Sequence, residues 1–119
     1  MKTVVIGAST NSDRYSFKAT NMLLKYNHEV IPIGIKKGSI GGLEILNNKP
    51  EINNVDTVTL YVSDKNQVEY YDYIINVLNP RRIIFNPGTE NDELEKLAKE
   101  KNIEASIACT LVLLSTNQY

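Results

Sequence analysis

The sequence predicts an α/β fold in which helices cover both faces of a mostly parallel, five-stranded sheet. Short apolar runs rich in Val and Ile alternate along the chain with segments of helical period, and clusters of glycine and polar residues follow most of these runs. This alternation is typical of parallel strands joined by crossover helices. We therefore expect a Rossmann-like three-layer sandwich, and an additional short edge strand remains open.

Five apolar runs are the expected strands, and they occupy residues 3–6, 29–35, 57–62, 82–85 and 103–108. β-branched residues dominate the runs, which favours extended structure. Three expected helices cover residues 16–26, 65–78 and 91–101, where apolar residues recur at helical spacing. Their buried faces are predicted to consist of Ala19, Met22, Leu23 and Tyr26 in the first helix, Val68, Tyr71, Ile75 and Leu78 in the second, and Leu94, Leu97 and Ala98 in the third.

Polar residues mark the helix starts. Ser16 is the expected N-cap of the first helix, and Asp64 with Gln67 resembles a capping box for the second. Asn91, followed by two acidic residues, suits the start of the third, where the helix dipole favours negative charge.

The remaining segments are less regular. Residues 36–54 contain glycines that indicate turns, and GLEIL (42–46) is the candidate edge strand. The tail, residues 110–119, is apolar and then polar, which suits either a short helix packed on the sheet or a contact in a dimer. Because the chain shows neither a repeat nor an interdomain linker, we expect residues 1–119 to form one domain.

Composition excludes several classes of protein. The net charge of −1 gives no reason to expect nucleic acid as a partner, and no run approaches the roughly 20 apolar residues of a membrane helix. The chain starts directly with a strand-like run, so no secretion signal is expected, and the single Cys allows no internal disulfide. We expect a cytoplasmic protein with a small-molecule partner, and leave a homodimer or an unknown protein partner open.

The inventory of catalytic groups is small. The one His, His28, lies in a polar turn where we expect it to be exposed to solvent, and one His with one Cys does not make a metal site. Glu90 is the best candidate for an acid or base, although a carboxylate near a helix start also has a structural reason. No catalytic residue is therefore predicted, and enzyme activity stays open.

The strand ends predict where a ligand binds, because open parallel sheets bind ligands outside the carboxyl ends of their strands. At the first strand end, Gly7 permits a tight turn and hydroxyl donors follow it, which suits a phosphate at the start of a helix. The residues concerned are Gly7, Ala8, Ser9, Thr10, Arg14, Ser16 and Lys18.

The residues at the second strand end indicate whether the ligand carries a phosphate on its ribose. An NAD site has an acidic residue there to accept from the ribose hydroxyl, whereas this strand ends with Gly34 and then Lys36 and Lys37. Two ammonium groups suit a phosphate on the ribose. NADP and coenzyme A (CoA) both carry such a phosphate.

The ordered set of motifs resembles the CoA-binding domain family, which also occurs at the start of the succinyl-CoA synthetase α subunit. The matching stretches are GAST with RYSFKA, VIPIGIKKG, LYVS, FNPGTEN and the Cys of ACT, and they span essentially the whole chain. The second, catalytic domain of that subunit has no counterpart here, so the resemblance implies binding of CoA or an acyl-CoA and not the ligase reaction.

The resemblance also implies roles for individual residues. The first loop would hold phosphates, and Lys37, with Lys36 beside it, would meet the ribose phosphate. The end of the third strand would line the nucleotide, and the segment after the fourth would lie along the pantetheine arm. These last two regions are Tyr61, Val62 and Ser63, and Asn86, Pro87 and Gly88.

Other functions remain open. An NADP-dependent oxidoreductase explains the two lysines equally well, although the first loop lacks the later glycines of the dinucleotide fingerprint. A module that senses CoA and reports to a partner protein is also compatible with the sequence. Cys109, at the end of the last strand, is either a small buried hydrophobe or a thiol that forms a mixed disulfide with CoA.

Overall fold

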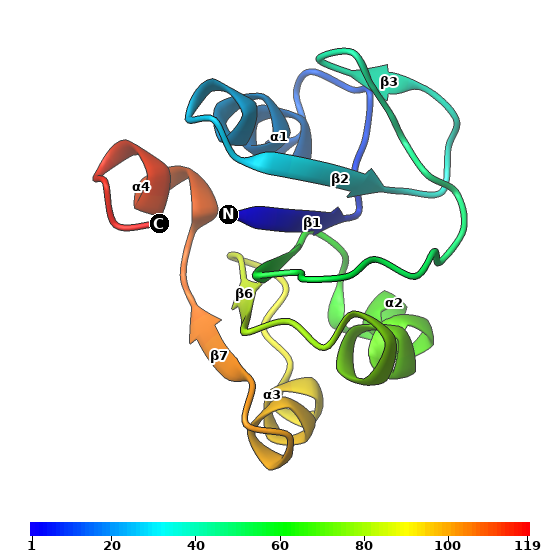
Figure 1. Ribbon diagram of the computed structural model, residues 1–119, viewed down its shortest axis with the longest axis vertical. Coiled ribbons are helices and arrows are strands. Elements are labelled where there is room, and N and C mark those ends of the chain that lie inside the picture. The colour runs from blue at the N-terminus through cyan, green and yellow to red at the C-terminus, as the bar shows by residue number, and fades with distance from the viewer.

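Figure 1 shows a computed structural model of the protein, which describes residues 1–119. The central sheet contains five strands, all parallel, in the order β2-β1-β5-β6-β7. They are β1 (Lys2–Ile6), β2 (Glu29–Ile33), β5 (Thr57–Leu60), β6 (Arg82–Phe85) and β7 (Glu104–Ile107). The predicted sheet is therefore confirmed.

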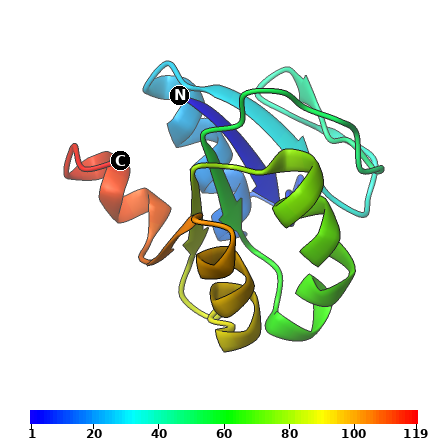
Figure 2. The same ribbon diagram turned by 60° about the horizontal axis from the view of Figure 1, so that its bottom comes forward.

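Helices cover both faces of the sheet, as Figure 1 and Figure 2 show. One face packs against α1 (Tyr15–Lys25) and α4 (Thr110–Ser115). The other packs against α3 (Asp92–Glu100) and a helical segment made of α2 (Asp64–Gln67), the 3-10 helix η1 (Val68–Tyr70) and the π-helix η2 (Tyr73–Leu78). Alternate strand residues supply the two cores, so Val4 and Ile6 face the second layer of helices while Val5 faces the first.

The prediction of one regular helix over residues 65–78 is wrong. The segment changes from α to 3-10 to π geometry, and each change alters the rotation per residue. Val68, predicted to be buried, is 56% exposed, whereas Tyr70 and Ile74 point into the core. The fully buried amide of Gln67 donates to the carbonyls of Val62 and Thr89 and thereby turns this side of the helix inward.

Two of the three predicted helix caps are also wrong. α1 begins at Tyr15, and Ser16 is buried within its first turn, where its carbonyl accepts from the Thr20 hydroxyl. Gln67 is occupied by the bonds just described and does not form a capping box. The third cap is confirmed, because the Asn91 side chain accepts from the backbone N–H groups of Glu93 and Leu94.

The irregular region forms a small hairpin of β3 (Ser39–Ile40) and β4 (Leu43–Glu44), outside the main sheet. The main sheet gains only a single parallel bridge at this edge, between Ile33 and Leu46. The tail forms α4, which packs beside α1, and the Tyr119 hydroxyl lies 2.6 Å from the Thr3 hydroxyl. None of the helices has the length and apolar character that crossing a membrane requires.

Candidate functional site

The strand order creates a switch point between β1 and β5. From β1 the chain passes through α1 to β2 on one side, and from β2 it returns across the sheet to β5 on the other side. The loops that follow β1 and β5 therefore leave the sheet toward opposite faces. A crevice opens between them at the carboxyl ends of the strands, which is where such sheets bind ligands.

A groove of about 390 Å³ lies at this point, and we call it the switch groove. Its walls come from the loop after β1, the segment after β2, and the start of the helical segment after β5. The lining residues are Gly7, Ala8, Ser9, Thr10, Arg14, Gly34, Ile35, Lys36, Val62, Asn66, Glu69 and Tyr70.

Two glycines hold the walls of the switch groove close together. Gly7 has a φ of +97°, and a Cβ there would lie 2.8 Å from the carbonyl oxygen of Tyr61. At Gly34 a Cβ would collide with the carbonyl oxygen of Ala8. The loop after β1 is thus packed between the ends of both neighbouring strands, which only glycine at these two positions permits.

The loop after β1 contains backbone N–H groups that have no partner in the chain. The carbonyl of Ile33 accepts from the N–H groups of Gly7 and Ala8, and the Ser9 hydroxyl accepts from Asn11. The N–H groups of Ser9 and Thr10 donate to no other group of the chain. Because α1 starts just beyond, its positive end adds to the attraction for an anion.

The charged residues that line the switch groove are two cations and one anion, a net positive charge. Arg14 and Lys36 contribute two cations, and Glu69 contributes one carboxylate on the wall formed by η1. No acidic residue follows β2 before the hairpin, so the usual acceptor for ribose hydroxyls is missing from that position. The groove therefore offers donors and cations for more than one phosphate.

Half of the residues predicted for the site meet in the switch groove. They are Gly7, Ala8, Ser9, Thr10, Arg14, Gly34, Lys36 and Val62.

The basic residues Lys37 and Lys18 lie elsewhere. Lys37 lines a separate surface hollow beside Gly38 and the β3–β4 hairpin. The ammonium group of Lys18 lies 5.3 Å from the centre of the Tyr15 ring, on the exposed side of α1. Of the two lysines after β2, only Lys36 lines the groove.

The predicted residues after β6 divide into structural and exposed ones. Asn86 is 1% exposed; its amide donates to the Thr59 hydroxyl and the Leu60 carbonyl, and its oxygen accepts from the N–H of Thr110. Pro87 and Gly88 are exposed at the carboxyl edge of the sheet, and the Gly88 N–H donates to Glu90. The Asn86 side chain is thus fully used in joining β5, β6 and α4.

The three other predicted residues, Ser16, Tyr61 and Ser63, do not line the groove either. Ser16 is buried in α1, and Ser63 is the exposed N-cap of α2. The Tyr61 ring packs toward the α1 face, and its buried hydroxyl has no hydrogen-bond partner. Burial raises the pKa of Tyr61 well above its ordinary value.

Four lining residues were missed by the sequence reasoning: Ile35, Asn66, Glu69 and Tyr70. Ile35 lies between the glycine and the lysine of the predicted strand end, and its 84% exposure makes it an unusual apolar residue at the groove. The other three lie on α2 and η1. The helix geometry changes there, so the sequence period does not predict which side chains point to the groove. The strand-end rule points to residues that end or closely follow a strand, so it could have found Ile35 and Asn66 but not Glu69 or Tyr70.

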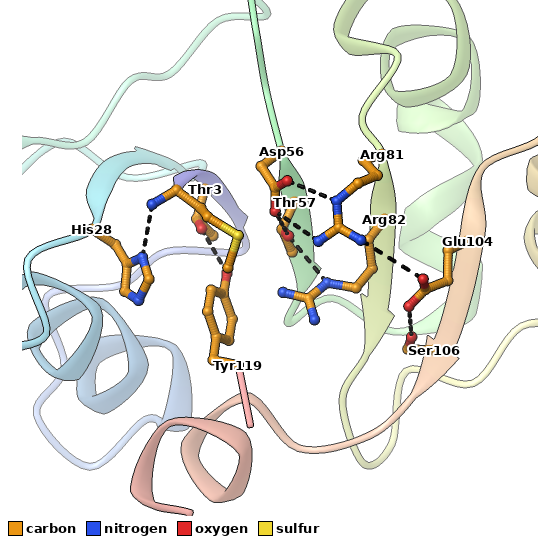
Figure 3. Close-up of polar contacts among 10 residues, drawn as sticks. Thr3, His28, Asp56, Thr57, Arg81, Arg82, Glu104, Ser106 and Tyr119 are labelled. Carbon is orange, nitrogen blue, oxygen red and sulfur yellow. Dashed lines mark hydrogen bonds and ion pairs between the residues drawn. The ribbon is translucent and has the colours of Figure 1, made fainter. Parts of the chain in front are cut away.

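A second polar cluster lies at the opposite, amino end of the strands (Figure 3). Arg82 is 7% exposed, donates to the Thr57 hydroxyl and lies 4.6 Å from the centre of the Tyr119 ring. His28, predicted to be exposed, is half-buried here and accepts from the N-terminal ammonium group of Met1. Partial burial and that ammonium group lower the pKa of His28. The cluster is therefore separate from the switch groove.

The other reactive candidates also lie apart from the groove. Cys109 is half-buried directly before α4, beyond the end of the edge strand β7, and it does not line the groove. Glu90 is exposed and accepts from the Gly88 N–H. No three His, Cys, Asp or Glu side chains gather into a group that suits a metal ion.

The sheet order and the groove at its switch point define a Rossmann-like α/β protein. Comparison with known families matches residues 1–115 to the family described as CoA binding domain. The chain belongs to this CoA-binding domain family. A search of curated proteins found no match.

Solved structures agree with this fold. A crystal structure described only as that of an uncharacterized protein is 48% identical, with a TM-score of 0.96 over 99% of this chain and 97% of that one. A hypothetical protein from Pyrococcus horikoshii OT3 is 23% identical, with a TM-score of 0.84 over 96% of this chain and 81% of that one. A protein from Thermus thermophilus is 17% identical, with a TM-score of 0.85 over 99% and 90% of the two chains. The last two likenesses concern the fold alone.

Proposed function

We propose that this protein binds CoA or an acyl-CoA in the switch groove and acts as a binding protein without catalysis of its own. The observation that carries the proposal is the presence of unpaired backbone N–H groups, Arg14 and Lys36 on one groove at the switch point. Membership of the CoA-binding domain family supports CoA as the ligand.

Each part of the ligand has a proposed location. The diphosphate accepts from the N–H groups of Ser9 and Thr10 and lies near Arg14. The ribose phosphate lies against Lys36, with Lys37 contributing charge from outside the groove. The pantetheine arm passes the exposed Pro87 and Gly88, where nothing lies within 4 Å of the position that a Cβ of Gly88 would occupy.

NADP is the second candidate ligand, because Lys36 suits its ribose phosphate as well. The first loop distinguishes the two, since it has Gly7 but not the further glycines that bring a dinucleotide pyrophosphate close to the helix. We therefore rank NADP below CoA.

Thermal unfolding in the presence of candidate ligands tests the proposal. A ligand that binds only the folded state raises the Tm in proportion to the logarithm of its concentration once it is above Kd. We expect the order CoA, then dephospho-CoA, with NADP and NAD giving smaller shifts. A larger shift with NADP than with CoA would assign the groove to the dinucleotide, and no shift with any of the four would remove the proposal.

A further inference from the structure

The segment Ile35–Lys37 carries two residues that line the groove, Ile35 and Lys36, but has almost no structure of its own. It lies between β2 and β3, and none of its backbone N–H groups donates to another group of the chain. Ile35 is 84% exposed, so packing does not hold the segment either. Without another contact, its backbone would be free to move.

One side chain supplies that contact. The amide group of Asn47 donates to the carbonyl of Gly34 at 2.9 Å and to the carbonyl of Lys36 at 3.0 Å. These two bonds tie Lys36 to Gly34, the residue directly before the segment. The bond to Lys36 is the only hydrogen bond that any backbone group of Ile35–Lys37 makes within the chain.

The residue directly before Asn47 is fixed to the main sheet by hydrogen bonds. This residue, Leu46, forms the parallel bridge to Ile33: its N–H donates to Pro32 at 2.9 Å, and its carbonyl accepts from Gly34 at 3.0 Å. The Asn47 side chain therefore projects from a backbone that is fixed to the edge of the main sheet. Its amide group, bonded to the carbonyl of Lys36, links Lys36 to the edge of the main sheet.

We propose that Asn47 is a positioning residue, which orders the segment after β2 so that Lys36 lines the switch groove before a ligand arrives. Without the amide, the segment would have to be ordered during binding, and that cost would reduce affinity. The role in affinity rests on the proposed function, whereas the ordering itself does not. We expect Asn47→Ala to weaken CoA binding about five- to tenfold.

The first test needs no ligand. The {¹H}–¹⁵N heteronuclear NOE of the amides of Ile35, Lys36 and Lys37 reports their motion on the ps–ns timescale. In Asn47→Ala we expect these values to fall toward those of a flexible loop while the rest of the protein keeps its values. Asn53→Ala is the matched control, because Asn53 is exposed on the same long loop and its side chain makes no hydrogen bond. Unchanged values in Asn47→Ala would overturn the proposal.

The second test is a double-mutant cycle measured by calorimetry with CoA. If Asn47 acts through Lys36, Asn47→Ala should cost much less affinity in a Lys36→Ala background than in the wild type. Equal losses in the two backgrounds would overturn the link to Lys36, as would an undiminished affinity in Asn47→Ala alone. Failure of the wild type to bind CoA would instead contradict the proposed function, and the NOE measurement would still decide the ordering role.

Discussion

Gly34 lies against the carbonyl oxygen of Ala8, so closely that a Cβ on Gly34 would collide with that oxygen. This contact joins the loop after β1 to the end of β2. Both residues line the switch groove, and their separation sets how the free N–H groups of the first loop lie relative to Lys36. Packing of glycine against backbone, rather than any side chain, therefore forms this part of the site.

Replacing Gly34 by Ala should disturb both stability and binding. The backbone must move to admit the methyl group, which we expect to cost about 2–3 kcal/mol of unfolding free energy. Gly88→Ala is the control, because its surroundings are open and only its φ of +90° is unfavourable, which should cost about 1 kcal/mol. Urea unfolding of the two variants measures both values, and equal costs would contradict the close contact.

Asn86 should matter for stability more than for ligand contact. Asn86→Ala removes the side chain that bonds the Leu60 carbonyl, the Thr110 N–H and the Thr59 hydroxyl, and of these the Thr59 hydroxyl keeps the Thr110 hydroxyl as a partner. We expect a loss of about 2–3 kcal/mol in unfolding free energy, against almost none for the exposed Asn53→Ala. A variant of unchanged stability that no longer bound CoA would show that Asn86 is a ligand residue after all.

Tyr119 should stabilise the fold by covering Arg82. Tyr119→Phe removes the hydroxyl bond to Thr3 but keeps the ring over the guanidinium, and we expect it to cost about 1 kcal/mol. Tyr119→Ala also removes the packing of the ring and its cation–π contact with the Arg82 guanidinium, and we expect a total loss of about 2–4 kcal/mol. Chemical denaturation of the pair separates the two contributions; identical losses would mean that the ring does not act on Arg82.

Asp56 should make stability depend on pH in the acid range. The hydrogen-bonded guanidinium of Arg81, 2.8 Å away, lowers the pKa of Asp56 below its ordinary value. On acidification the unfolded chain therefore takes up this proton first, at a pH of about 4. The stabilisation is complete above that pH and is lost as the pH falls through the lower pKa of the folded state.

The measurement is the unfolding free energy of the wild type and of Asp56→Asn between neutral and acid pH. We expect the wild type to be the more stable at neutral pH and the difference to shrink below about pH 4. High salt should reduce the difference, because the Arg81 side chain is 54% exposed. A difference that is constant with pH would contradict this role.

The strands and the location of the switch groove could be predicted from the sequence because both depend on simple patterns. Val4 and Ile6 alternate with Val5 toward two cores, and this requires helices on both faces. Parallel strands then bring their carboxyl ends together, so the turn after Gly7 and the segment after β2 had to be neighbours. The capping role of Asn91 could also be predicted, because it depends only on residues close to it in the sequence.

Side-chain direction in irregular segments could not be predicted. Lys36 and Lys37 are adjacent and chemically alike, and the bond from the Asn47 amide to the Lys36 carbonyl is a long-range contact that distinguishes them. Gln67 illustrates the same limit, because its bonds to two distant carbonyls override the helical period that predicted a buried Val68. Such long-range amide contacts leave no periodic signal in the sequence.

Calorimetric titration of ligand-stripped protein with CoA and dephospho-CoA tests the central claim most directly. We expect CoA to bind about tenfold more tightly than dephospho-CoA, because only CoA presents a ribose phosphate to Lys36. Lys36→Ala should abolish that preference, and Lys37→Ala should reduce it less. Equal affinities of the wild type for the two ligands, or no binding of CoA, would contradict the account.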